Sequence, residues 1–99
     1  MAHAMRNTEE ELLIILMEEC AEVIQQASKI IRFGKTPPTK KEKSLAKELG
    51  DLLCMIILLE EYGTVSKNAV TENCLAKREK LKEWSNLPLE LLDSDDRSI

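Results

Sequence analysis

The sequence predicts an all-α protein, a helical bundle that is completed by homo-oligomerisation. Three observations predict this class: apolar residues recur at helical spacing, caps and helix-ending glycines or prolines separate the apolar segments, and no segment reads as a convincing strand. The 99 residues fit one domain. We expect this helical domain at residues 8–92, between a flexible N-terminus (1–7) and a flexible acidic tail (93–99).

The first expected helix begins with a capping box, which Thr8 forms with Glu11. The apolar pattern then runs from Leu12 to Phe33. Gly34 and two prolines shortly after it are typical of a helix end, so the first helix is expected to stop there.

The second expected helix follows another capping box, formed by Thr39 and Glu42. Its apolar period continues from Leu45 to Tyr62, and Gly63 comes directly after it. This glycine indicates the end of the second helix.

The third expected helix opens at Ser66 and runs to about Trp84, and Pro88 is placed at the first turn of a short fourth helix over 89–92. Lys77 falls within the apolar stripe of the third helix. A lysine there can bind a phosphate, or it can extend to solvent or pair with an acid. Trp84 is expected in the core or an interface, with stacking on a base as the alternative.

Both long N-terminal helices are apolar on more than one face. A helix that is apolar nearly all round must be buried nearly all round, and three helices from one short chain cannot surround two such helices. We therefore expect a second copy to supply the cover, in a homodimer or homotetramer. A loosely packed monomer is the alternative.

The composition excludes several classes of protein. The net charge of −4 argues against a protein that coats nucleic acid. The longest apolar run, 52–59, is far shorter than a membrane span, and no signal peptide is recognisable, so a cytoplasmic protein is expected. The three cysteines, Cys20, Cys54 and Cys74, form no CxxC pair and fall within apolar patterns, which predicts buried, reduced thiols.

Five acids on the first two helices are the candidate functional residues. Glu18, Glu19 and Glu22 lie within about one turn of the first helix, and Glu48 and Asp51 share a face of the second. No Lys or Arg lies one turn away from the three glutamates. Like charges at this spacing cost about 0.2–0.5 kcal/mol on an exposed helix, and more among apolar neighbours. A divalent cation would reverse the sign of this interaction.

These acids also carry a resemblance. The segments 18–22 (EECAE) and 48–51 (ELGD) resemble the EExxE…ExxD signature of the MazG-like superfamily of all-α nucleoside triphosphate pyrophosphohydrolases, and the similarity extends over about 12–84. The resemblance implies an Mg²⁺-dependent enzyme of nucleotide metabolism. It would hydrolyse NTPs or dNTPs between the α and β phosphates and release a nucleoside monophosphate and pyrophosphate.

The resemblance also implies a role for each matched residue. Glu18 would help to bind a second ion or would orient the attacking water, and we expect it to be the catalytic base. The metal ligands would be Glu19, Glu22, Glu48 and Asp51. On the third helix, the phosphates of the substrate would be bound by Asn73, Lys77 and Lys80.

The chemistry of the acids agrees with magnesium. Mg²⁺ prefers hard oxygen ligands, so a carboxylate cluster without His or Cys suits it better than zinc or copper, and Mn²⁺ is the expected substitute. Gly50, between Glu48 and Asp51, either lets another helix or a ligand approach closely or is a tolerated packing glycine.

Two alternative functions stay open at the level of the sequence. Phosphoribosyl-ATP pyrophosphohydrolase belongs to the same superfamily, and a test of phosphoribosyl-ATP beside the canonical nucleotides would separate the two activities. A non-enzymatic helical interaction module is the other alternative. Its acids would form a solvated face or bind a basic partner.

Overall fold

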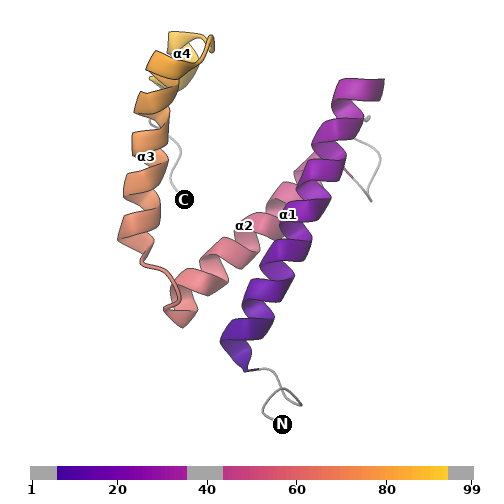
Figure 1. Ribbon diagram of the computed structural model, residues 1–99, viewed down its shortest axis with the longest axis vertical. Helices are drawn as coiled ribbons and strands as arrows, with labels where there is room; N and C mark the ends of the chain where they lie inside the picture. Colours follow the sequence, from indigo (N-terminus) through magenta and orange to yellow (C-terminus); the bar gives the residue numbers. More distant parts are fainter. Residues whose placement is uncertain (1–6, 36–43, 94–99) are drawn as a thin grey trace. The chain divides into compact units, whose positions relative to one another are not determined.

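In the computed structural model, residues 7–35 and 44–93 are described, and they form four α-helices and no strand (Figure 1). The helices are α1 (Thr8–Phe33), α2 (Leu45–Tyr62), α3 (Lys67–Trp84) and α4 (Leu89–Leu92). The predicted all-α class is thereby confirmed. The chain divides into two compact units, Met1–Thr64 and Val65–Ile99.

Helix α1 is capped by Asn7, and the predicted capping box of Thr8 and Glu11 is wrong. The Asn7 side chain accepts a hydrogen bond from the backbone N–H of Glu10 at 2.7 Å, so Thr8 is already inside the helix. Asn is one of the strongest N-cap residues and ranks above Thr, which explains the shift by one residue. Three glutamates in the first turn also suit the positive end of the helix dipole.

Glycines end both long helices of the first unit, as predicted. Gly34 follows α1 with a φ of 87° and donates its N–H to the carbonyl of Ile30. Gly63 follows α2 in the left-handed conformation, with a φ of 93°, and its N–H reaches the carbonyl of Leu59. Both φ values lie in the region that only glycine adopts without strain.

Ser44 caps α2, with its Oγ accepting a hydrogen bond from the N–H of Lys47 at 3.0 Å. The predicted capping box of Thr39 and Glu42 lies outside the described residues, as do the two prolines after Gly34.

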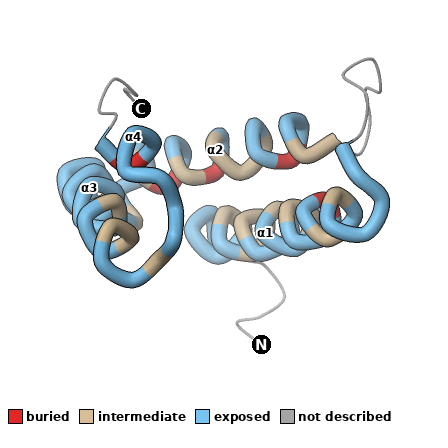
Figure 2. Tube along the Cα trace, turned by 90° about the horizontal axis from the view of Figure 1, so that it is seen from above, coloured by how far each residue is buried: buried red, intermediate tan, exposed pale blue. Residues whose placement is uncertain are grey.

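Helices α1 and α2 pack side by side as an antiparallel hairpin (Figures 1 and 2). At one end of this pair, the Thr64 hydroxyl donates to the Glu9 carboxylate at 2.9 Å, which joins the end of α2 to the start of α1. The buried residues of α2 are Glu48, Met55 and Leu59. This register brings the middle of α1 to the first half of α2.

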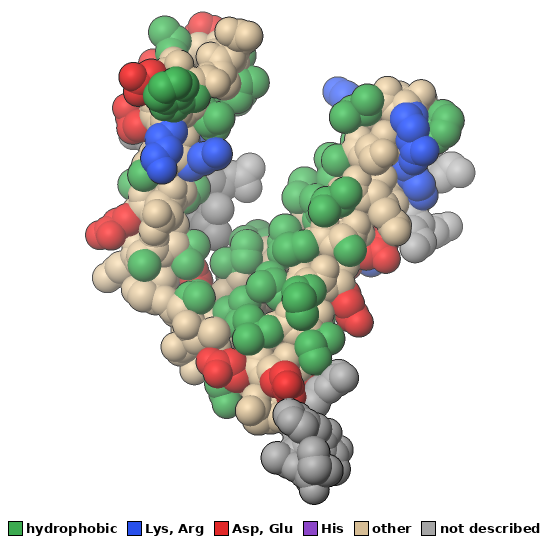
Figure 3. Space-filling model, in the orientation of Figure 1, with side chains coloured by type: hydrophobic (Ala, Val, Ile, Leu, Met, Phe, Trp, Pro, Cys, Tyr) green, Lys and Arg blue, Asp and Glu red, His purple; other side chains and the backbone are tan. Residues whose placement is uncertain are grey.

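Few apolar side chains are buried within the described residues: Met55, Leu59 and Leu92. Figure 3 shows hydrophobic side chains gathered over α1 and α2 on the surface of the chain. On α1 these exposed side chains include Ile24, Ile31 and Phe33. No described helix combines the length and apolar character that crossing a membrane requires.

The expectation of buried thiols is wrong for this chain, because Cys20, Cys54 and Cys74 are all exposed, although they are free as predicted. Trp84 is also exposed, with 79% of its surface accessible, so it does not lie in the core of the chain. Helical apolar patterns identify the faces that avoid water, and one chain supplies too few helices to cover all of them.

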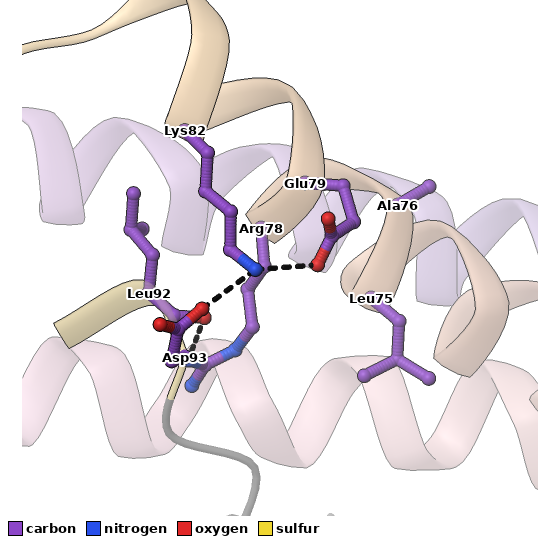
Figure 4. Close-up of a pocket in the computed structure, with 7 residues that line it drawn as sticks. All are labelled: Leu75, Ala76, Arg78, Glu79, Lys82, Leu92 and Asp93. Carbon is purple, nitrogen blue, oxygen red and sulfur yellow. Dashed lines mark hydrogen bonds and ion pairs between the residues drawn. The ribbon is translucent and has the colours of Figure 1, made fainter. Parts of the chain in front are cut away.

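Helices α3 and α4 form the second unit, with α3 capped by Ser66 as expected. Arg78 of α3 donates to the carbonyls of Leu91 and Leu92 at 3.0 and 3.2 Å. Lys82 forms ion pairs with Glu79 at 2.9 Å and with Asp93 at 2.6 Å (Figure 4). Asp93 is the C-cap residue of α4, and the remainder of the predicted acidic tail, 94–99, lies outside the described residues.

Candidate metal centre

Three carboxylates meet across the α1–α2 hairpin. Glu19 comes from α1, whereas Glu48 and Asp51 come from one face of α2 at a spacing of three residues. One carboxylate oxygen from each residue lies within 4.8 Å of the other two. The antiparallel pairing of the helices therefore assembles the acid cluster from two segments that are far apart in the sequence.

This cluster is partly withdrawn from water. Glu48 is buried, with 4% of its surface accessible, and Glu19 and Asp51 are half-buried. Desolvation raises the pKa of Glu19 above its ordinary value, and the charges of Asp51 and Glu48 raise it further. The ionised acids thus repel one another in a region where water screens them poorly.

Lys47 is the counter-charge that sequence reasoning missed. Its Nζ lies 2.8 Å from Oδ2 of Asp51 and 3.9 Å from Oε2 of Glu48. The hydrogen bond to Asp51 raises the pKa of Lys47, which keeps this side chain protonated. No Lys or Arg lies one turn away from the three glutamates along α1, but α2 supplies Lys47 to the assembled cluster. The spacing of Lys47 and Asp51, one helical turn, was the signal in the sequence.

The donor set of the cluster fits a hard divalent cation. All three side chains offer carboxylate oxygens, and no His or Cys joins the group. The separation of up to 4.8 Å is close to the range of about 3 to 4.2 Å for oxygens bound to one Mg²⁺ ion. Carboxylate ligands of this kind suit Mg²⁺ and Mn²⁺ better than the softer transition metals.

Comparison with known proteins decides the family. A family model described as the MazG nucleotide pyrophosphohydrolase domain matches residues 7–84, which is most of the chain. The chain belongs to the MazG family. Comparison with curated proteins and with solved structures gave no match. The MazG match covers α1, α2 and α3, and with them every site residue predicted from the sequence, and it supports nucleotide pyrophosphohydrolase activity in general.

Glu22, the fourth predicted metal ligand of the MazG domain, lies outside the group of three carboxylates. It is half-buried on α1, three residues beyond Glu19, and its charge contributes to the raised pKa of Glu19. Gln26 lies one further turn along the same face and is 2% exposed. Its Nε2 is buried and has no hydrogen-bond partner among the described residues. Gln26 was not among the site residues predicted from the sequence, although its heptad spacing from Glu19 already placed it on the same face.

Glu18, the predicted base, is exposed on α1 next to Glu19 and does not join the cluster. Its position, about 100° around the helix from Glu19, directs it to a different side of α1. In this chain the carboxylate is therefore accessible to water.

The three predicted phosphate ligands lie on α3, in the second unit. Asn73, Lys77 and Lys80 follow one another at spacings of four and three, so they share one face of the helix, and all three are exposed. The Asn73 amide donates to the carbonyl of Ala69 at 2.7 Å. Lys77 is exposed, which agrees with the alternatives in which it extends to solvent or binds a phosphate, and Arg78 is the half-buried cation of α3, held by the carbonyls of α4.

Proposed function

We propose that this MazG domain is a Mg²⁺-dependent nucleoside triphosphate pyrophosphohydrolase, which converts an NTP or dNTP and water into the monophosphate and pyrophosphate. The supporting observation is the cluster of Glu19, Glu48 and Asp51, whose oxygens lie within 4.8 Å of one another in a chain of the MazG family. Mn²⁺ has the same preference for oxygen ligands and should replace Mg²⁺.

Four acids would hold the cation: Glu19, Glu48, Asp51 and, from the next turn of α1, Glu22. A bound Mg²⁺ would supply positive charge to the phosphate oxygens and to the departing pyrophosphate. The acids themselves would fix the position of the ion, because Glu48 is buried and its backbone lies in a regular helix.

Glu18 is the proposed base. Its exposed carboxylate would accept a proton from a water molecule as the water oxygen forms a bond to the α phosphorus. The bond from the α phosphorus to the bridging oxygen would break, and its electron pair would leave with pyrophosphate. On α3, Asn73, Lys77 and Lys80 are the proposed phosphate ligands, which their shared exposed face supports.

We also propose that the enzyme is a homodimer or homotetramer. Large apolar side chains on α2, such as Leu49, Ile57 and Leu58, are exposed in the single chain, with 37–46% of their surfaces accessible. A second copy would remove these side chains from water.

A substrate panel tests the proposed reaction. Purified protein is incubated with each NTP and dNTP, and with phosphoribosyl-ATP, in Mg²⁺, Mn²⁺ or excess EDTA, and the products are separated by chromatography. We expect monophosphate and pyrophosphate with either metal and none in EDTA. Reaction in ¹⁸O-labelled water should place the label in the monophosphate, because water attacks the α phosphorus.

The controls are Glu48→Gln and Asp51→Asn, which should each lower turnover at least about a hundredfold while the protein stays folded. Release of a diphosphate and orthophosphate would contradict the reaction, and full activity in excess chelator would contradict the metal. If phosphoribosyl-ATP is the only compound hydrolysed, the enzyme is a phosphoribosyl-ATP pyrophosphohydrolase.

A further inference from the structure

Lys47 brings a positive charge to the acid cluster. Its ammonium contacts Asp51 at 2.8 Å and Glu48 at 3.9 Å, and its positive charge also acts on Glu19. Among the described residues, no other Lys or Arg forms an ion pair with these three acids. The ammonium and a divalent cation would therefore compete for the same carboxylate oxygens.

The helix itself does not favour a cation at this position. Lys47 lies in the first turn of α2, three residues after the N-cap Ser44. The positive end of the helix dipole disfavours a lysine there. The contacts with Asp51 and Glu48 are thus what stabilises the charge of Lys47 in this place.

The lysine is also free to leave without movement of the helices. Its side chain is 48% exposed, whereas that of Glu48 is 5% exposed. A lysine stem is long and flexible, so the ammonium can turn to solvent while the carboxylates stay where the backbone holds them.

We propose that Lys47 is the exchangeable counter-cation of the acid cluster: it neutralises the metal-free site and is displaced when a divalent cation binds. This inference rests on the proposed function, since it takes the cluster to be the metal site. Lys47 is accordingly a positioning residue, which keeps the acids together in the metal-free protein and sets the affinity for the metal. The exchange breaks the hydrogen bond from Lys47 to Asp51 but no covalent bond, and the lysine remains protonated.

The test is a titration with Mn²⁺ alone, followed by electron paramagnetic resonance or calorimetry, without nucleotide. Lys47→Met should bind Mn²⁺ roughly three- to thirtyfold more tightly than the wild type, because the ion no longer has to displace an ammonium from Asp51 and Glu48. Lys47→Arg keeps the charge and should stay within about threefold of the wild type on the same argument.

Lys29→Met is the matched control, since it removes the same charge from an exposed position on α1. Lys29 lies ten residues from Glu19, or about 15 Å along the helix, beyond the screening length at physiological salt. Its affinity for Mn²⁺ should equal that of the wild type. Unchanged or weaker Mn²⁺ binding by Lys47→Met would overturn the role of Lys47.

Thermal unfolding gives a second readout. In chelator, Lys47→Met should melt at a lower temperature than the wild type, because its acids have lost their counter-charge, and saturating Mn²⁺ should remove this difference. Lys47→Gln serves the same purpose if the Met variant does not fold. A deficit that persists in saturating Mn²⁺ would show an ordinary structural role and overturn the proposal.

The titration separates the two hypotheses. If the wild type binds no Mn²⁺, both the metal site and the exchange fail. If the wild type binds Mn²⁺ and Glu48→Gln does not, the metal site stands, and the affinity of Lys47→Met alone decides whether Lys47 is the exchangeable cation.

Discussion

At the scale of single residues, the acid cluster combines negative charge with poor hydration. Glu48 is almost fully buried, and Glu19 and Asp51 lie beside it with Lys47 as the neighbouring cation. A charge that loses water destabilises the fold unless partners replace that water. The metal-free chain therefore carries a local penalty at this cluster, and neutralising one acid should relieve part of it.

The pH dependence of stability should reveal this penalty. The pKa of folded Glu19 lies above its ordinary value of 4.5, so the folded chain takes up this proton more readily than the unfolded chain. Ionised Glu19 therefore destabilises the fold at neutral pH. The penalty disappears as the pH falls through the folded pKa toward 4.5.

Glu19→Gln should accordingly melt at a higher temperature than the wild type at neutral pH, in chelator, and the difference should shrink toward pH 4.5. Calorimetry across this range measures it. Glu18→Gln removes the same charge at an exposed position and should change the melting temperature at neutral pH by less. A Glu19→Gln variant that melts below the wild type at neutral pH would contradict the cause assigned to the raised pKa.

The sequence predicted one site formed by Glu19, Glu22, Glu48 and Asp51. The structure brings three of these acids together, without Glu22, and adds a cation that was not predicted. Glu19, Glu48 and Asp51 could be assigned because their spacing within each helix and their match to a known signature are both local properties. Lys47 was overlooked because counter-charges were sought along α1, and the relevant neighbour of Glu19 comes from α2. The role of Glu22 in metal binding stays a prediction.

At the scale of elements, helix limits followed the local chemistry of caps closely. The ends at Phe33 and Tyr62 were predictable because a glycine follows each helix and adopts a positive φ. The start of α1 was misplaced by one step, since Asn7 and Thr8 are both acceptable caps and only the hydrogen bond to Glu10 distinguishes them.

Gly50 gives a test of what surrounds α2. A Cβ at this position would meet no atom within 4 Å in the chain, so its own packing does not require glycine. Gly50→Ala should stabilise the metal-free protein by about 1 kcal/mol through helix propensity alone. At low protein concentration this appears as a melting temperature higher by roughly 4–8 °C.

Ala27→Gly, at an exposed position of α1, should shift the melting temperature in the opposite direction by a similar amount. A Gly50→Ala variant that is less stable or loses metal binding would mean that a ligand or a second copy approaches α2 at this glycine.

The attachment of α4 depends on Leu92, which is 5% exposed, together with the bonds from Arg78 and Lys82. Leu92→Ala should cost about 2–5 kcal/mol of packing, enough to detach a helix of one turn. Hydrogen exchange at the Asp93 amide, which donates to Leu89, should then become fast. Leu91→Ala is the control, because Leu91 is 57% exposed and its exchange pattern should remain that of the wild type.

At the scale of the whole molecule, exposed apolar surface is the dominant feature. Ile57 of α2 is 37% exposed in the single chain and lies within the most apolar segment of the sequence. If copies associate through this surface, Ile57→Glu would bury an unpaired charge at a cost of several kcal/mol.

Ile57→Glu should therefore dissociate or unfold the assembly and abolish activity, although no proposed metal ligand is changed. Light scattering should give at least two chains for the wild type, and Ile57→Val should behave like it. A wild-type protein that is monomeric and active would contradict the proposed association.

The sequence could show that α1 and α2 are apolar on several faces, but not which faces one chain covers. That is why Cys20 and Cys54 were assigned to buried positions and are exposed in the chain. An apolar pattern shows that a helix face is shielded from water. The pattern is the same whether the shielding residues belong to the same chain or to another copy.

The three exposed cysteines place one thiol on each long helix: Cys20 on α1, Cys54 on α2 and Cys74 on α3. Their rates of alkylation can therefore report which surfaces are covered, and no cysteine has to be introduced by mutation. A thiol whose labelling slows as the protein is concentrated lies on a surface that association covers, and one whose rate stays constant lies outside it. Mass spectrometry of each cysteine peptide across a dilution series would thus map the contact helix by helix.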